Sequence, residues 1–212
     1  MNVQEATTRR LPDLKERHLP ENCRETINTI LKETYGYEQF RNLEIYDDLS
    51  KGKEKLCISQ GQLIENVILE AEKAWKGETQ VDNILLTAPT GSGKSLLFQL
   101  PAIYLGKEYN LLTIMVSPLK ALIVDQVESL QELGYMRVAY ASSDLSPEQK
   151  MEVYRQVREG EIDLFYLSPE LLLSYDIKHF VGERRIGLVV VDEAHTVTTW
   201  GKEFRVDYWF LG

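Results

Sequence analysis

The segment Ala88–Ser95, which reads A-P-T-G-S-G-K-S, limits the possible folds of this chain more than any other stretch. It follows the apolar run Ile84–Leu86 and precedes the mainly apolar run Leu96–Leu100. A strand, a glycine-rich turn and a helix in this order form the context that a phosphate-binding loop requires. The alternative, a chance glycine turn before a helix, does not explain a lysine and a serine in register with the motif. The segment therefore predicts a nucleotide-binding site.

Each part of this loop has a physical role in binding ATP. Glycines let backbone N–H groups close around phosphate oxygens, and the first amides of the following helix point at the same anion. Lys94 is placed to reach the β- and γ-phosphates, and Ser95 is placed to hold Mg²⁺. Ala88 stands where the motif has its first glycine, so the match is A-x-x-G-x-G-K-S. The predicted nucleotide-binding residues of the loop are Thr90, Gly91, Ser92, Gly93, Lys94 and Ser95.

A second motif supplies candidate catalytic carboxylates. The apolar run Val189–Val191 leads into Asp192-Glu193-Ala194-His195. Asp192 is expected to hold Mg²⁺ through water, because Mg²⁺ keeps much of its hydration shell. Glu193 is suited to orient and deprotonate an attacking water, and His195 to bridge the nucleotide site to the next element. An isolated Asp-Glu pair could simply end a strand, but together with the phosphate loop it predicts phosphoryl transfer to water.

Apolar runs alternate with amphipathic helices over most of the chain, which predicts an α/β fold with a mostly parallel sheet flanked by helices. Ligands of such sheets bind at the carboxyl ends of the strands. Strands are expected at Ile84–Ala88, Leu111–Ser117, Arg137–Ala141, Leu164–Leu167 and Leu188–Val191. Helices are expected from Gln60 to Lys76 and at Lys94–Leu105, Leu119–Leu133, Pro147–Glu159 and Glu170–Tyr175.

The first 56 residues have a different pattern. Apolar residues at helical spacing predict a short helix within Glu21–Thr34, and Lys51–Lys55 is expected to be a charged, solvated loop. We therefore divide the chain into an N-terminal helical extension, residues 1–56, and a nucleotide-binding domain, residues 57–212.

Composition bounds the partners and the compartment. The chain has 212 residues and a net charge of −9, from 24 Lys and Arg against 33 Asp and Glu. This balance argues against a broad nucleic-acid-binding surface but leaves room for a local groove. No apolar run approaches the roughly 18 residues of a membrane helix, and the N-terminus lacks the apolar core of a signal peptide. Cys23 and Cys57 lack metal-ligand or redox spacing. We expect a cytoplasmic protein with no membrane partner.

Three further segments carry candidate nucleic-acid contacts. Two Ser-Pro pairs each follow a predicted strand and open a helix, where hydroxyls and helix amides suit phosphate groups; simple N-capping is the alternative for both. The third segment crowds aromatic side chains beside cations, which suits stacking on unpaired bases; a hydrophobic plug is the alternative, above all for Phe204. The predicted contacts are Ser117, Pro118, Lys120, Ser168, Pro169, Glu170, Trp200, Lys202, Phe204 and Arg205.

Together these motifs resemble the RecQ family of superfamily 2 DNA helicases. Ser117–Val127 resembles the family's motif Ia, Leu167–Leu171 its motif Ib, and Thr196–Tyr208 its aromatic-rich loop. The resemblance covers about residues 60–212 and implies a RecA-like lobe of an ATP-dependent helicase that moves 3′–5′ on single-stranded or forked DNA. It also implies a second RecA-like lobe in the full protein, and a location at the nucleoid in a bacterium or in the nucleus of a eukaryote. Lys202-Glu203 departs from the family's His-Asp.

The family's adenine-reading glutamine is expected at Gln62, before the amphipathic helix that starts near Gln60. The upstream segment Tyr35–Arg41 resembles the lead-in to that motif, but Glu44 stands where the glutamine should follow. An insertion that splits the motif would reconcile the two positions.

Other functions remain open at the level of the sequence. A DNA-dependent translocase or remodelling subunit would use the same ATPase without separating strands, and a nucleotide-dependent switch would bind without hydrolysis. An RNA helicase is disfavoured by the DNA family's aromatic loop. The missing second lobe carries the arginine that completes the ATP site in the family, so we expect these 212 residues alone to bind ATP weakly and to hydrolyse it poorly.

Overall fold

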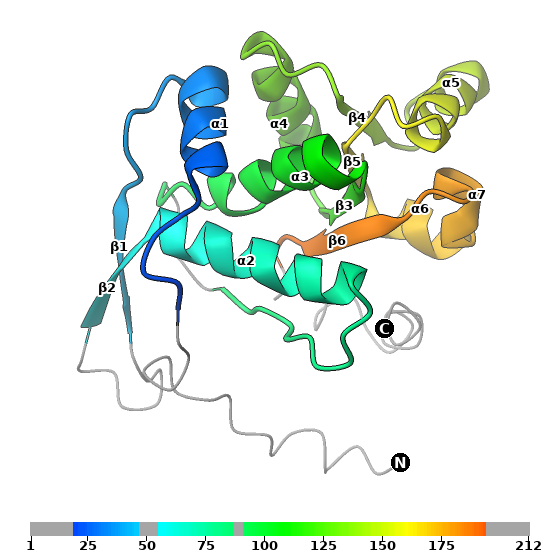
Figure 1. Cartoon of the computed structure of the whole chain (residues 1–212). Helices are drawn as coiled ribbons and strands as arrows, with labels where there is room; N and C mark the ends of the chain where they lie inside the picture. The colour runs from blue at the N-terminus through cyan, green and yellow to red at the C-terminus, as the bar shows by residue number, and fades with distance from the viewer. Residues whose placement is uncertain (1–18, 47–54, 87–90, 194–212) are drawn as a thin grey trace.

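A computed structural model describes residues 19–46, 55–86 and 91–193, with a parallel sheet at its centre (Figure 1). Its four strands have the order β4-β5-β3-β6. They are β3 (Leu112–Val116), β4 (Val138–Ala141), β5 (Leu164–Leu167) and β6 (Ile186–Val191), within one or two residues of the prediction. All pair in parallel, so the predicted α/β class is confirmed.

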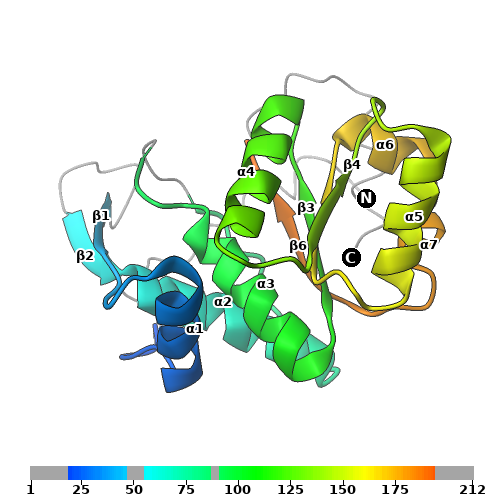
Figure 2. The same ribbon diagram turned by 90° about the horizontal axis from the view of Figure 1, so that it is seen from above.

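The helices cover both faces of this sheet (Figure 2). One face packs against α2, α3 and α4, with α1 packed on the outer side of α3, and the other face packs against α5, α6 and α7. Their bounds are α1 (Glu25–Tyr35), α2 (Gln60–Trp75), α3 (Leu96–Tyr109), α4 (Lys120–Glu132), α5 (Pro147–Arg158), α6 (Pro169–Ser174) and α7 (Ile177–Val181). In the part of the chain that the structure describes, every helix is too short or too polar to cross a membrane.

Successive strand residues enter opposite cores, as the pleat requires. Met115 and Tyr166 pack on the side of α2 and α3, whereas Ile114 and Phe165 pack on the side of α5 and α7. The two central strands β3 and β5 are buried along their whole length. This explains why these strands read in the sequence as continuous apolar runs.

The N-terminal extension is only partly helical. Helix α1 is confirmed, but Asn42–Tyr46 (β1) and Lys55–Ser59 (β2) form an antiparallel hairpin that was not predicted. The extension also shares the main core, because Ile27, Ile30 and Leu31 of α1 are buried in the cluster that α2 and α3 form.

The predicted strand at Ile84–Ala88 is wrong for its described residues. Residues 84–86 belong to no strand, and the side chains of Ile84 and Leu85 are exposed. The connection that leads to them is held to helix α2 instead of the sheet, because the N–H of Asp82 donates to Glu70 Oε2 at 2.8 Å. Thr87 and Ala88 lie outside the described residues.

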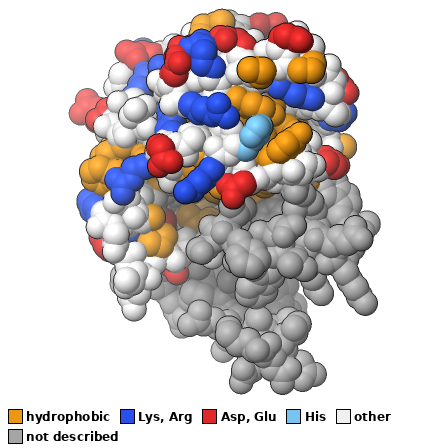
Figure 3. All heavy atoms as spheres, turned by 90° about the vertical axis from the view of Figure 1, so that its right-hand side faces the viewer, with side chains coloured by type: hydrophobic (Ala, Val, Ile, Leu, Met, Phe, Trp, Pro, Cys, Tyr) orange, Lys and Arg blue, Asp and Glu red, His pale blue; other side chains and the backbone are white. Residues whose placement is uncertain are grey.

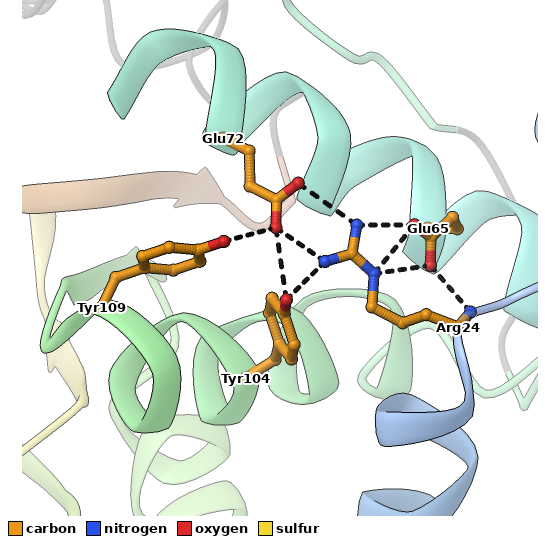
Figure 4. A network of polar contacts seen from close by, with 5 residues as sticks. All are labelled: Arg24, Glu65, Glu72, Tyr104 and Tyr109. Carbon is orange, nitrogen blue, oxygen red and sulfur yellow. Dashed lines mark hydrogen bonds and ion pairs between the residues drawn. The ribbon is translucent and has the colours of Figure 1, made fainter. Parts of the chain in front are cut away.

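An ionic cluster fixes the start of α1 on the body of the domain (Figure 4). Arg24 donates to Glu65 and Glu72 of α2, with N–O distances of 2.6 Å to each carboxylate. The hydroxyl of Tyr109 donates to Glu72 at 2.9 Å, and Arg24 also contacts the hydroxyl of Tyr104. We call these five residues the Arg24 cluster. The Arg24 cluster thus ties the N-terminal extension to α2 and α3.

Candidate nucleotide-binding site

The phosphate loop has the backbone that its sequence predicts. Gly91 and Gly93 have φ of +80° and +79°, in the left-handed region that favours glycine. Helix α3 follows, and its first bonds run from the N–H of Leu96 to Gly93 O and from the N–H of Leu97 to Lys94 O. The lysine therefore lies in the turn directly before the helix, next to its N-cap Ser95. Thr90 lies outside the described residues.

Two observations fit an anion in this loop. The hydroxyl of Ser92 is buried and has no hydrogen-bond partner in the described part of the protein, so a phosphate oxygen would satisfy it. The side-chain amide of Gln60 donates to the carbonyls of Ser92 and Gly93, at 3.1 and 3.3 Å. These bonds tie the carbonyl groups of the loop to Gln60.

A pocket of about 230 Å³ lies directly beside the loop. Aromatic and polar side chains of the extension form one wall, and the loop and α3 form the other. The described lining comprises Leu31, Tyr35, Tyr37, Gln39, Arg41, Gln60, Gly93, Ser95, Leu96 and Gln99. Tyr37 is half exposed, which leaves a ring face for a planar base. The pocket has the place and the chemistry for the adenine of ATP.

Gln62, the predicted adenine-reading residue, is occupied elsewhere. Its Oε1 accepts from the N–H of Ser59 in a capping box, and its Nε2 donates to Pro20 O at 3.1 Å. Three glutamines line the pocket, Gln39, Gln60 and Gln99. Gln60, only 1% exposed, is the one whose amide donates to the loop carbonyls. The adenine-reading role of Gln62 stays a prediction, and Gln60 is a second candidate for this role.

The β1–β2 hairpin explains how Gln60 comes to lie beside the phosphate loop. It is inserted between Arg41 and Gln60, and the chain returns so that Gln60 N donates to Arg41 O at 2.9 Å. Gln60 Oε1 in turn accepts from the N–H of Arg41 at 3.1 Å. The sequence signal for Gln60 is the Phe40-Arg41 lead-in combined with an insertion of unknown length.

The candidate catalytic carboxylate Asp192 follows β6 at the carboxyl edge of the sheet. Its N–H donates to Val116 O of β3 at 2.9 Å, which extends the ladder by one residue. Glu193 has φ of +49°, and its N–H donates to Asp192 Oδ1 at 2.9 Å. In this tight turn the backbone N–H of Glu193 therefore orients the carboxylate of Asp192. His195 lies outside the described residues.

The oxygen donors present suit Mg²⁺. Ser95 offers a hydroxyl and Asp192 a carboxylate, and both are hard ligands of the kind that Mg²⁺ takes in small number beside phosphates and water. Among the described residues no group of three or more His, Cys, Asp or Glu side chains gathers to form a closed metal cage. The donor set fits a cation shared with a nucleotide.

The predicted DNA contacts in motifs Ia and Ib differ in how exposed they are. Ser117 is buried with no partner for its hydroxyl among the described residues, and Pro169 is buried as well. Ser168 accepts from the N–H of Leu171 and caps α6, so the capping alternative holds for this residue. The remaining three, Pro118, Lys120 and Glu170, are half-buried or exposed.

Lys120, the first residue of α4, is engaged by an anion of the protein itself. Its ammonium donates to Asp144 at 3.0 Å and also contacts the hydroxyl of Ser143. A DNA phosphate would have to compete with this carboxylate. The predicted contacts Trp200, Lys202, Phe204 and Arg205 lie outside the described residues.

A second groove, of about 370 Å³, lies between α5 and the α6–α7 pair. Figure 3 shows this side of the molecule, where hydrophobic and basic side chains surround a histidine. Met151, Tyr154, Arg158, Tyr175 and His179 line the groove. The groove lies over the hydrophobic core on the other face of the sheet from the phosphate loop.

The comparisons with known proteins agree with the motifs. The family model described as DEAD/DEAH box helicase matches residues 62–210. The ATP-dependent DNA helicase RecQ of Synechocystis sp. is 33% identical over 191 residues, covering 89% of this chain and 33% of that protein. The corresponding RecQ helicases of Bacillus subtilis and Haemophilus influenzae are 32% and 30% identical and cover 85% and 88% of this chain. The predicted resemblance to RecQ helicases is thereby confirmed.

The structural comparison supports the fold. A crystal structure of the DUF1998 helicase MrfA bound to DNA matches 85% of this chain and 21% of that chain, with a TM-score of 0.50 and 22% sequence identity. The fold is thus the RecA-like α/β fold of helicase lobes. The chain spans about a quarter to a third of the length of the curated RecQ relatives named above.

Proposed function

Since the chain belongs to the DEAD/DEAH box helicase family, we propose that it is the ATP-binding motor lobe of a RecQ-like DNA helicase. The observation that carries the proposal is the joint placement of the phosphate loop and the pocket that Tyr37, Arg41 and Gln60 line. ATP and Mg²⁺ are the proposed cofactors, and single-stranded or forked DNA is the proposed substrate.

In this proposal the protein works mainly by positioning and by charge stabilisation. The amides of the loop and the first turn of α3 hold the phosphates, and Lys94 neutralises the charge that develops on the γ-phosphoryl group. Glu193 orients the attacking water and accepts its proton. Bound Mg²⁺ would be held by Ser95 and Asp192 and would neutralise charge on the phosphate oxygens.

We further propose that the full protein moves 3′–5′ along DNA and needs a second RecA-like lobe. The similarity of motifs Ia and Ib and of the aromatic segment to RecQ helicases supports this direction and substrate. His195, Trp200 and Arg205 would then couple the catalytic carboxylates to DNA. A cytoplasmic protein that associates with the nucleoid, or a nuclear protein in a eukaryote, is the corresponding location.

A translocase or remodelling subunit without strand separation is the second candidate. The acidic net charge of −9 and the departure of Lys202-Glu203 from the family's His-Asp leave room for it. Unwinding of a forked duplex by the full-length protein distinguishes the two functions. Unwinding that depends on ATP supports the helicase; ATP turnover stimulated by DNA without unwinding supports the translocase.

Calorimetric titration of this chain with ATP and Mg²⁺ tests the core of the proposal. We expect binding that Lys94→Ala weakens by at least about tenfold, because a charge-assisted contact to phosphate is lost. Lys107→Ala, at an exposed lysine in the last turn of α3, is the matched control and is expected to bind like the parent. Equal binding by the parent and by Lys94→Ala would remove the nucleotide site from the phosphate loop.

A further inference from the structure

A chain of hydrogen bonds between uncharged side chains begins at Tyr35 on α1 and ends at Ser95 of the phosphate loop. The hydroxyl of Tyr35 donates to Gln99 Oε1 at 2.8 Å. The amide of Gln99 donates to the hydroxyl of Tyr166 and to Gln126 Oε1, at 3.4 Å each. The hydroxyl of Tyr166 donates to the same Gln126 oxygen at 3.0 Å, and Gln126 Nε2 donates to Ser95 Oγ at 3.5 Å. We call Tyr35, Gln99, Tyr166 and Gln126 the polar relay.

The two central residues of the polar relay, Gln99 and Tyr166, are buried, and Tyr35 and Gln126 at its ends are half-buried. Tyr166 is 1% exposed and Gln99 is 5% exposed, so each needs protein partners for its polar atoms. Burial raises the pKa of Tyr166, and the nearby carboxylate of Asp192 raises it further although the bond from Gln99 opposes this. The hydroxyl therefore stays protonated and remains a donor to Gln126 at neutral pH.

The direction of the bonds matters for Ser95. A hydroxyl has one hydrogen and two lone pairs. Gln126 donates to Ser95 and so uses one lone pair. The other lone pair remains for a hard cation, and the hydrogen remains for a carboxylate. An oxygen-bound Mg²⁺ needs this state of the serine.

We propose that Gln126 is a positioning residue that sets the Ser95 hydroxyl for Mg²⁺, and that the polar relay holds Gln126 in place. The inference rests on the proposed binding of ATP. Gln126 lies on α4, six residues after Lys120, so the helix that orients the serine also carries a predicted DNA contact. Neither the phosphate-loop motif nor the Asp-Glu motif contains any member of the relay.

The test measures how much Mg²⁺ strengthens ATP binding. ATP is titrated into this chain by calorimetry, once with Mg²⁺ and once with EDTA, and the ratio of the two dissociation constants is compared. We expect Gln126→Met, which keeps the volume but removes the amide, to reduce this ratio by about two- to tenfold, the effect of one hydrogen bond. Gln131→Met on the same helix is the matched control and is expected to keep the parent's ratio.

A double variant separates positioning from packing. Tyr166→Phe keeps the ring and removes the bond to Gln126, so we expect a smaller loss of the same ratio. In a Gln126→Met background the Tyr166→Phe change should have no further effect on it, because the two residues act through one bond to Ser95. Additive losses would assign the effects to packing and overturn the relay.

Other outcomes are equally decisive. A folded Gln126→Met variant with the parent's ratio overturns the inference, and if that variant does not fold, Tyr166→Phe alone with the parent's ratio does the same. Failure of the parent to bind ATP, or undiminished binding by Lys94→Ala, counts against the proposed function and removes the inference with it.

Discussion

The two edges of the parallel sheet carry different polar chemistry. At the amino edge, Asp163 precedes β5 and is fully buried, and its carboxylate accepts from Tyr135, Arg137 and Arg184 at 2.6–3.1 Å. At the carboxyl edge, the polar relay is built from neutral tyrosine and glutamine side chains that are buried or half-buried. We call Asp163 and its three partners the Asp163 cluster.

We infer from this difference that the amino edge of the sheet serves stability and the carboxyl edge serves ligand binding. A buried charge that loses its partners is strongly destabilising, so a charged cluster allows one arrangement only. A neutral hydrogen bond contributes about 1 kcal/mol, so its partners exchange at small cost when a ligand binds. The charged cluster lies at the edge away from the predicted ligands, and the neutral relay lies at the edge where parallel sheets bind them.

The largest expected effect is at the amino edge. Asp163→Asn leaves the guanidinium of Arg184, whose side chain is 4% exposed, without its charge partner. We expect the free energy of unfolding to fall by about 3–5 kcal/mol, measured by urea denaturation. Asp125→Asn, at an exposed aspartate of α4, is the control and should change stability little. A loss below that of the relay variants discussed below would contradict the division between the two edges.

The Arg24 cluster gives the next largest effect, because it is charged but only partly buried. Arg24→Met removes the bonds to Glu65 and Glu72, and we expect a loss of about 1.5–3 kcal/mol in urea denaturation. Arg24→Lys is expected to restore only part of it, since an ammonium cannot form the forked contacts of the guanidinium. Full restoration by lysine would mean that charge alone holds α1.

The same cluster predicts a dependence of stability on pH. Burial raises the pKa of Glu72, but the bonds from Arg24 and Tyr109 outweigh it, and the net pKa lies below the ordinary value of 4.5. A depressed pKa stabilises the fold above the unfolded value and loses this contribution as the pH falls through the folded value. We therefore expect the parent to lose more stability than Arg24→Met when urea denaturation is repeated below pH 4.5. Parallel losses would contradict the role of Glu72.

Most of the fold follows from local patterns. Each strand of the sheet is a short apolar run, and Ser146-Pro147 starts α5 with a capping box that the sequence displays. The β1–β2 hairpin was not foreseen, although apolar residues alternate with other residues in both strands, because each strand has only five residues and the charged segment 47–54, which separates them, lacks a two-residue turn signal. Ile84–Leu86 looked like a strand by composition, yet the bond from Asp82 to Glu70 ties the approach to that segment to α2. Such a tertiary contact leaves no trace in local sequence.

The candidate site likewise has parts that local sequence predicts and parts that it does not. The phosphate loop and the Asp192-Glu193 turn depend on consecutive residues, so their positions and their local backbone could be predicted directly from the sequence. Gln60 was missed because it meets Arg41 across the hairpin insertion, and the polar relay was missed because its members come from α1, α3, α4 and β5. Long-range contacts between neutral side chains have no periodic signature.

The neutral relay should tolerate substitution better than either charged cluster. For Tyr35→Phe we expect a loss of about 0.5–1.5 kcal/mol in urea denaturation, because one hydrogen bond to Gln99 disappears while the ring keeps its packing. Tyr37→Phe, at a half-exposed ring of the same segment, is the control and should lie within experimental error of the parent. A Tyr35→Phe loss as large as that of Asp163→Asn would place a stability centre at the carboxyl edge and break the comparison.

The smallest effect on stability is expected where the carboxyl edge meets solvent. Asp144→Asn removes an exposed partner of Lys120 and should leave the midpoint of urea unfolding unchanged, since exposed ion pairs add little. The same change should strengthen binding of a fluorescent oligothymidylate about twofold at low salt, because Lys120 becomes free for a phosphate and one repelling charge is lost. The gain should shrink as salt is raised. Glu132→Gln, which removes an exposed charge from the last residue of α4 and leaves Lys120 and Asp144 unchanged, separates the two causes. An equal gain would assign the effect to net charge. A gain confined to Asp144→Asn would identify Lys120 as a DNA contact that Asp144 blocks in the free protein.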